Sequence, residues 1–254
     1  MIIDVHCHVD LYEKPEEIVE RAKKAGVWRI IAVSMDTNSM WRTLSIAEGF
    51  ESVVKPALGV HPLAVQLNFS VERDLEEALS LMRRKSDKVV AVGEVGLDSY
   101  QSKVGELQLK QEEVFRAMLD FAVEKQLPVI VHSFRAERKT FSILGEYGDL
   151  TAIIHWFTGP SELLEEGIKK GYYFSVTPAI TYSAKVRRVA RRVPLELLFC
   201  ESDGPVEYRG VIGEPANCRM VIKNIADVKG LEISRVEEAL LENVKRVFKR
   251  VNCT

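Results

Sequence analysis

The chain has 254 residues, of which 46% are hydrophobic and 28% are charged, and its formal net charge is −2 at pH 7. This composition supplies enough apolar material for a sizeable core and excludes an intrinsically disordered chain, while no apolar run is long enough to cross a bilayer. The near-zero charge excludes a general attraction to polyanions, so local groups would have to hold any nucleic acid.

Apolar runs rich in β-branched residues alternate with stretches of helical periodicity, and no linker divides the chain. The apolar runs predict eight strands, at Ile2–His6, Arg29–Ser34, Val53–Val60, Val89–Gly93, Pro128–His132, Thr151–His155, Tyr172–Val176 and Leu197–Glu201. The periodic stretches predict helices at Pro15–Ala25, Ser39–Phe50, Val71–Lys85, Gly105–Glu124, Glu137–Tyr147, Ser161–Lys169 and Ser183–Arg192, and a pair between Pro215 and Val251. Eight strands, each followed by a helix, predict a (β/α)8 TIM barrel that forms one domain over residues 1–254. An open, doubly wound sheet is the alternative architecture.

Residues able to bind metal ions gather at the ends of the predicted strands. A (β/α)8 barrel carries its active site at the carboxyl ends of its strands, so functional side chains are expected there. Random placement would put several histidines on helices, which fill more of the chain. Instead, all five histidines and two acidic residues fall at or just after strand ends: His6, His8, His61, Glu94, His132, His155 and Asp203.

The first strand leads into His6-Cys7-His8. Side chains alternate between the two faces of a strand, so both imidazoles point one way while Cys7 points the other. Two imidazoles on one side of a strand end can hold a metal ion between them. Taken alone, the pattern fits two partly buried histidines that are merely hydrogen-bonded equally well.

The whole set exceeds what one ion needs, since a single site takes three protein ligands plus water. We therefore predict two divalent metal ions, zinc, manganese or magnesium, which share a carboxylate and a bridging hydroxide. His6, His8 and Asp203 are assigned to one ion, and His132 and His155 to the other, with Glu94 shared between them. Asp203 and Glu94 are the predicted catalytic residues, and Asp203 accepts the proton of the nucleophile.

Two of these positions also have plainer interpretations. His61 begins a loop and falls outside the six assigned ligands, so we predict a substrate contact; the alternative is a histidine that caps a turn before Pro62. Asp203 precedes Gly204, and a surface aspartate in a turn is its alternative. The apolar strand just before Asp203 favours a place at the mouth of the barrel.

Cysteine spacing and the first residues bear on the cellular compartment. The four cysteines show no Cys-x-x-Cys spacing, which argues against a zinc ribbon or a disulfide framework and fits a reducing compartment; they are Cys7, Cys200, Cys218 and Cys253. The first residues lack a basic leader and a cleavage site, so we expect a cytoplasmic protein. The most basic stretch, Lys185–Arg192, carries an apolar stripe at helical spacing, which favours a solvated helix face over a nucleic-acid track.

Six motifs, in order along nearly the whole chain, resemble the TatD family of metal-dependent hydrolases. They are Asp4-Val5-His6-Cys7-His8-Val9-Asp10, Gly59-Val60-His61-Pro62, Gly93-Glu94-Val95-Gly96-Leu97-Asp98, Leu127-Pro128-Val129-Ile130-Val131-His132-Ser133, Ile154-His155-Trp156-Phe157-Thr158-Gly159 and Glu201-Ser202-Asp203. Gln111-x-x-x-Phe115, Arg209-Gly210 and Glu214-Pro215-Ala216-Asn217 also fit. The resemblance implies a barrel with deoxyribonuclease activity, as in several members, the same metal ligands, and a substrate-phosphate role for His61.

The chain departs from the family pattern near the expected substrate. Phe134 and Arg135 follow His132-Ser133 where the family often has Arg-Asp, and Trp156 stands where a smaller residue is usual. Gly204, Val206 and Glu207 interrupt the usual Asp-Ser/Ala-Pro-Tyr stretch. No proposed metal ligand is affected, so the departures bear on substrate choice. Phe134, Arg135, Trp156 and Glu207 are expected to line the mouth.

These features favour a two-metal phosphodiesterase, an exonuclease that acts on DNA ends as a transient substrate. Arg135 and His61 would hold phosphate, and Trp156 would stack a base. The alternative enzyme is a hydrolase of amides, esters or lactones, because many amidohydrolases open with the same His-x-His. These commonly bridge two metals through a carbamylated lysine after the fourth strand, where this chain has Glu94. A non-catalytic barrel is disfavoured by the intact ligand set, and no obligate protein partner is inferred.

Overall fold

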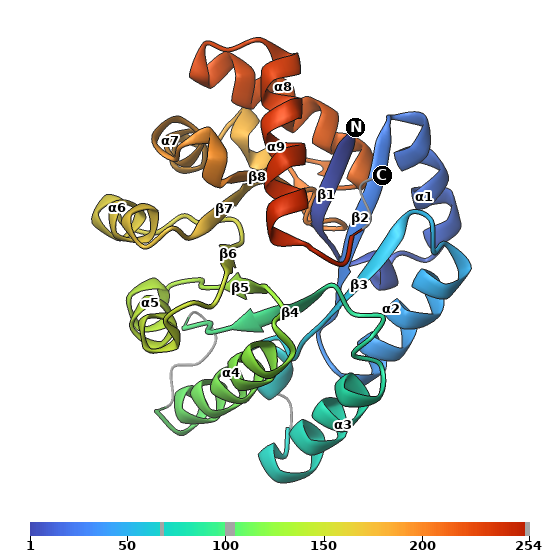
Figure 1. Cartoon of the computed structure of the whole chain (residues 1–254), viewed down its shortest axis with the longest axis vertical. Coiled ribbons are helices and arrows are strands. Elements are labelled where there is room, and N and C mark those ends of the chain that lie inside the picture. Colours follow the sequence, from blue (N-terminus) through green and yellow to red (C-terminus); the bar gives the residue numbers. More distant parts are fainter. Residues whose placement is uncertain (67–68, 100–104, 252–254) are drawn as a thin grey trace.

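Eight parallel strands, paired in chain order, form the centre of the structure, a computed structural model that describes residues 1–66, 69–99 and 105–251 (Figure 1). Each strand is a short apolar run with most of its side chains buried, as expected for parallel strands covered on both sides. The strands are β1 (Ile2–Cys7), β2 (Val27–Val33), β3 (Val54–Leu58), β4 (Ala91–Gly96), β5 (Val129–His132), β6 (Ala152–Ile154), β7 (Tyr173–Val176) and β8 (Leu198–Cys200).

A helix follows each strand and packs on the outside of the sheet (Figure 1). The predicted (β/α)8 barrel is therefore confirmed. The helices are α1 (Pro15–Lys24), α2 (Thr37–Gly49), α3 (Glu76–Arg84), α4 (Gly105–Lys125), α5 (Glu137–Leu144), α6 (Ser161–Lys169), α7 (Ala184–Arg192), α8 (Cys218–Lys229) and α9 (Ile233–Val247). Across the described residues, no helix is both long and apolar enough to cross a membrane.

Helix α7 shows how the sequence places these helices. Ser183 caps its amino end, where the side chain accepts a hydrogen bond from the Val186 N–H. Val186 and Val189 are buried on one stripe, while most of its basic residues are exposed. Arg192 pairs with Glu165 of α6 at 2.6 Å. The basic stretch is thus an outer helix face with partners within the protein.

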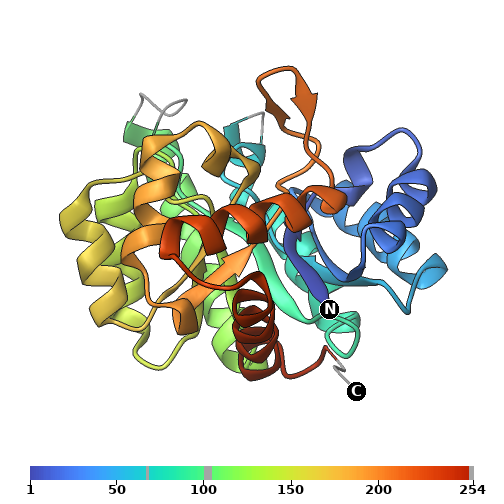
Figure 2. The same cartoon turned by 90° about the horizontal axis from the view of Figure 1, so that it is seen from above.

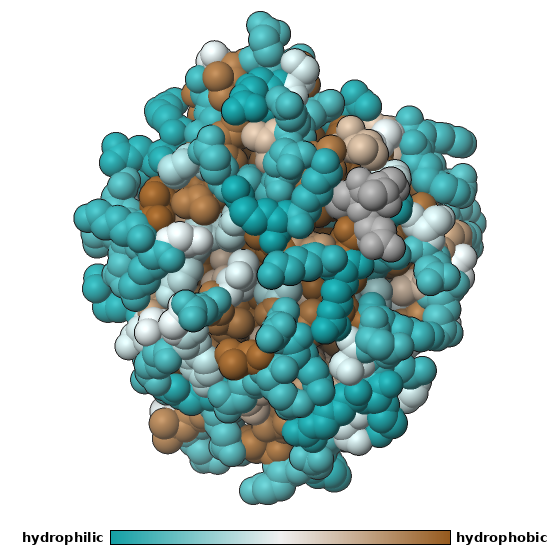
Figure 3. Space-filling view, in the orientation of Figure 1, coloured by the Kyte–Doolittle hydropathy of each residue, from teal (hydrophilic) through white to brown (hydrophobic). Residues whose placement is uncertain are grey.

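Side chains that point inward fill the barrel and close its amino end. Val5, Ile31, Ile130 and Phe199 pack in one buried cluster with Phe248, which directly follows α9. Helix α9 crosses this end of the barrel, where Figure 3 shows a surface made mostly of hydrophilic residues. The interior is therefore a packed core, as in other barrels of this class, and functional side chains are left to the opposite end.

The seam between β8 and β1 is joined beside the predicted site. The Asp203 N–H donates to the His6 carbonyl (2.9 Å), and the His8 N–H donates to the Gly204 carbonyl (2.8 Å). The buried Asp4 carboxylate accepts from both the N–H (2.9 Å) and the hydroxyl (2.5 Å) of Ser202. Three predicted metal ligands, His6, His8 and Asp203, thus belong to the two segments whose backbone hydrogen bonds close the barrel.

Several local features differ from the sequence-based expectations. The helix predicted at Val71–Lys85 begins with a separate helical turn, Val71–Leu75, before α3. A hairpin of β9 (Glu207–Tyr208) and β10 (Val211–Ile212) was not predicted, because two-residue strands show no periodicity. It projects on the side opposite α9 (Figure 2). Cys253 lies outside the described residues.

Strand β4 extends further than predicted. Its pairing with β5 is irregular after Val92 and resumes at Val95 and Gly96, so Glu94 lies inside the strand rather than at its end. Gly96 makes this possible, because a Cβ there would lie 2.0 Å from the carbonyl oxygen of His132. Its φ of +142° also favours glycine.

We expect Gly96→Ala to destabilise the protein by about 1–3 kcal/mol, the usual cost of overpacking a core. Urea unfolding of the metal-free protein measures this change. Gly49→Ala is the matched control, because a Cβ at the end of α2 meets no atom within 4 Å. Its free energy of unfolding should not fall. Equal stability of Gly96→Ala and the unmodified protein would contradict the close β4–β5 approach.

Candidate active site

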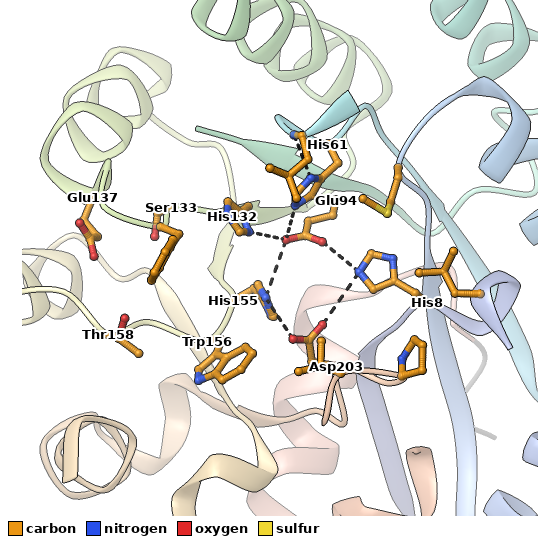
Figure 4. Close-up of a pocket in the computed structure, with 16 residues that line it drawn as sticks. His8, His61, Glu94, His132, Ser133, Glu137, His155, Trp156, Thr158 and Asp203 are labelled. Atoms are coloured by element: carbon orange, nitrogen blue, oxygen red, sulfur yellow. Dashed lines mark hydrogen bonds and ion pairs between the residues drawn. The ribbon is translucent and has the colours of Figure 1, made fainter. Parts of the chain in front are cut away.

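The structure brings the six predicted metal ligands together at the carboxyl end of the barrel. Figure 4 labels five of them, all except His6. Apart from Glu94, which lies inside β4, each side chain comes from a strand end or from a residue beside one, and β1 supplies two. They are His6 in β1, His8 just after it, Glu94 in β4, His132 at the end of β5, His155 after β6 and Asp203 after β8. Asp203 adopts a φ of 46°, which aspartate tolerates better than most residues.

One half of the cluster surrounds the Oε2 atom of Glu94. This oxygen lies 3.3 Å from Nε2 of His6 and 3.2 Å from Nε2 of His8. The Nε2 atoms of His6 and His8 are 3.4 Å apart, and Oδ1 of Asp203 lies 3.4 Å from Nε2 of His6. The group predicted to hold the first ion therefore converges on one point.

The other half of the cluster surrounds the Oε1 atom of Glu94. Nδ1 of His132 lies 2.9 Å from this oxygen, and Nε2 of His155 lies 3.7 Å from it. Nε2 of His61 is also close, at 3.3 Å. Glu94 thus turns one oxygen toward each predicted metal group, which is the arrangement that a shared carboxylate ligand needs.

The donor set fits divalent metal ions. A metal ion bound at 2.0–2.2 Å puts neighbouring N and O donors roughly 3–3.5 Å apart, and the distances around Oε2 of Glu94 fall in this range. On the other side, Nδ1 of His132 faces Oε1 of Glu94 at 2.9 Å. Two lone pairs at this distance repel each other unless a proton or a cation lies between them.

Burial and charge act in opposite directions on the pKa values of this cluster. Burial raises the pKa of Glu94, but the surrounding imidazoles, led by His61, outweigh it and hold that pKa well below its usual range. Burial lowers the pKa of His6 to about 4. Burial also acts to lower the pKa of His155, yet nearby carboxylates, led by Glu201, raise it to about 10. The buried Glu94 anion is therefore balanced by cations.

Two further carboxylates orient the imidazoles of the second group. Nδ1 of His155 donates to Oε1 of Glu201 (3.0 Å), which directs Nε2 toward the cluster as the atom that would bind a metal ion once its proton is displaced. Nε2 of His132 donates to Asp98 (3.0 Å), which leaves Nδ1 for the cluster. Such partners fix the tautomer of a ligating histidine. Gln111 accepts from the Asp98 N–H (3.1 Å) and so holds that loop.

The sequence did not assign a role to Glu201. Its only signal was an acidic residue at the end of an apolar strand, two positions before Asp203. Asp98 lies 3.0 Å from Nε2 of His132, so it orients a predicted ligand and does not only shape the loop after β4.

His61 is held in one tautomer. Its Nδ1 accepts a hydrogen bond from the Leu63 N–H (3.1 Å), so the ring proton must sit on Nε2. Burial lowers the pKa of His61, which favours the neutral ring. A protonated Nε2 is a donor and not a metal ligand, although it lies near Glu94 and His132. The geometry supports its assignment outside the ligand set.

A cavity of about 570 Å³ opens beside the cluster. The half-buried Trp156 lines it, along with six further apolar side chains: Leu11, Met35, Leu63, Phe134, Pro205 and Val206. Of the residues expected at the mouth, Arg135 and Glu207 are exposed and are not among the lining residues. The Arg135 guanidinium lies 5.6 Å from the centre of the Phe134 ring. Phosphate contact by Arg135 stays a prediction.

Known proteins resemble this chain over nearly its whole length. The sequence model of the family described as TatD related DNase matches residues 3–249. The human Deoxyribonuclease TATDN3 is 32% identical over 261 residues, which cover 98% of this chain and 95% of that protein. The uncharacterized metal-dependent hydrolase YabD of Bacillus subtilis is 32% identical over 266 residues, which cover 99% of this chain and 100% of that protein. The crystal structure of YjjV, a TatD homologue from Escherichia coli, superposes on this chain with a TM-score of 0.89 over 98% of both chains, and the two sequences are 30% identical.

We expect Glu201→Gln to weaken metal binding by roughly 10–100-fold, because the amide no longer fixes the tautomer of His155 as a carboxylate does. Calorimetric titration of the metal-stripped protein with Zn²⁺ or Mn²⁺ measures the affinity. Glu196→Gln, an exposed position shortly before β8, is the control and should bind as the unmodified protein does. Unchanged affinity in Glu201→Gln would remove the orienting role.

Proposed function

The chain belongs to the TatD-related DNase family, and from this premise we propose that it is a two-metal phosphodiesterase that removes nucleotides from single-stranded DNA ends. The observation that carries the proposal is the placement of Glu94. Each of its carboxylate oxygens faces a separate set of imidazoles at 2.9–3.7 Å. A site for one ion would not need both sets.

The metal ligands proposed are those predicted from the sequence. His6, His8 and Asp203, whose ligand atoms lie within 4.8 Å of one another, would hold one ion. His132 and His155, which both face Oε1 of Glu94, would hold the other, with Glu94 shared. When bound, such a pair of ions lowers the pKa of water and neutralises charge on the phosphoryl oxygens. Asp203 and Glu94 keep the catalytic roles predicted for them.

Asp203 would take the proton that the attacking water loses. Its carboxylate lines the cavity, with Oδ1 directed toward His6 (3.4 Å) and Oδ2 toward His155 (3.8 Å). A general base must lie within hydrogen-bond reach of the reacting group, and this position borders both predicted ions.

His61 would donate to the phosphate. Because Leu63 fixes its tautomer, Nε2 carries a proton without any change in protonation. This N–H lies 3.3 Å from Oε1 of Glu94, so a phosphate oxygen would take the place of that contact when Glu94 binds metal. A fixed donor aimed at the site where negative charge develops needs little reorganisation during the reaction. This role agrees with the substrate contact predicted from the sequence.

The cavity suits a terminal nucleotide. Its volume of about 570 Å³ falls within the usual range for pockets that enclose a small ligand, roughly 300–1,000 Å³. Trp156 offers a ring against which a base would stack. A base held inside a duplex would have to be unpaired first, so a single-stranded end is the simpler substrate.

One observation favours a second candidate, a hydrolase of esters, lactones or amides. Within the described part of the chain, none of the side chains lining the cavity is Lys or Arg. An apolar wall without cations also suits an uncharged substrate, because no ionic group then needs a partner.

We expect metal-stripped protein to shorten end-labelled single-stranded DNA only after magnesium, manganese or zinc is restored. Glu94→Gln should lower the rate at least about a hundredfold, since a shared ligand contributes several kcal/mol through both ions. Glu162→Gln, an exposed position on α6, should retain the rate. Gel analysis of oligonucleotides labelled at the 3′ or the 5′ end measures both rate and polarity.

Two outcomes would count against this function. Stoichiometric metal without cleavage of DNA or of a simple phosphodiester would leave the metal centre and refute the substrate. Metal-dependent hydrolysis of aryl esters or lactones by the same preparation would then establish the second candidate.

A further inference from the structure

The cavity has a second polar end, away from the metal centre. Glu137, the first residue of α5, lines this end, and the hydroxyl residues Ser133 and Thr158 line it as well. Figure 4 places all three on the side of the cavity opposite His8 and Asp203. Trp156 and the exposed ring of Phe134 belong to the same lining.

Glu137 is positioned to accept hydrogen bonds. It lies in the first turn of α5, where the helix dipole favours a negative charge. It packs against Gly159, since a Cβ at Gly159 would come within 2.9 Å of the Glu137 Cγ. A carboxylate offers acceptors only, whereas the hydroxyls of Ser133 and Thr158 can donate or accept.

This end of the cavity suits N–H groups and repels phosphate. No described Lys or Arg lines the cavity, so a second phosphate would meet the Glu137 carboxylate without a counter-ion. A nucleobase meets both requirements, because its face can stack on Trp156 while its edge carries donors. The nucleotide would then span the cavity, with its phosphate at the metal centre and its base at Glu137.

We propose that Glu137 determines base specificity and favours a terminal guanine over a terminal thymine, an inference that rests on the proposed function. Guanine presents two adjacent donors, N1–H and the N2 amino group, which match the two oxygens of one carboxylate. Adenine and cytosine present an amino group beside an acceptor, and thymine presents one N–H between two carbonyls. A carboxylate therefore pairs best with guanine and worst with thymine.

The test compares hydrolysis of single-stranded octamers that share one interior sequence and carry guanine, adenine, cytosine or thymine at both ends. The metal-loaded protein should cut the guanine-ended octamer on the order of tenfold faster than the thymine-ended one, measured as kcat/KM. Inosine ends, which lack only the N2 amino group, should fall between them. Glu137→Gln should remove most of this preference, because one acceptor becomes a donor. The control Glu162→Gln removes the same charge from the first turn of α6 and should keep the preference.

The outcomes separate this inference from the function on which it rests. Cleavage of all four octamers at equal rates, or a Glu137→Gln variant that keeps the guanine preference, would overturn the role of Glu137 and leave the nuclease intact. If no octamer is cut, the proposed function itself fails, and base specificity fails with it.

Discussion

A buried carboxylate shared by several imidazoles is the constraint on which this structure depends. Glu94 is almost fully buried and lies within 3.7 Å of a ring nitrogen of all five histidines. An unpaired charge at such a depth would cost several kcal/mol, so cations must remain beside it, as protons on imidazoles or as metal ions. The strand order of the barrel makes this possible, because β1, β4, β5 and β6 all deliver side chains to one end.

The fold and most of the site could be predicted because they rest on local patterns. Apolar runs and helical periodicity place the eight strands, and parallel strands necessarily bring His6, His132 and His155 to one end. The role of Glu201 could not be predicted, since its contact with His155 joins residues 46 positions apart. The extension of β4 past Glu94 also escaped prediction, because it depends on backbone approach at Gly96 and not on side-chain pattern.

The mouth and the floor of the cavity differ in polarity. Charged side chains line the floor beside Glu94, whereas apolar side chains such as Phe134 and Trp156 form the wall. The near-neutral chain also provides little long-range attraction for a polyanion. Affinity for a nucleic acid would therefore depend on contacts made inside the cavity, at the phosphate and the base, more than on steering along the backbone.

The closed amino end of the barrel has a consequence for turnover. The interior is filled by side chains such as Ile130 and Phe199, and Phe248 after α9 seals it, so the described residues leave no passage through the barrel. A product formed beside Glu94 would have to leave by the opening through which the substrate entered. For the exonuclease proposed above, the shortened strand would withdraw before the released nucleotide could diffuse away. Distributive cleavage, with one dissociation for each nucleotide removed and competition from free nucleotide, would follow from that single opening.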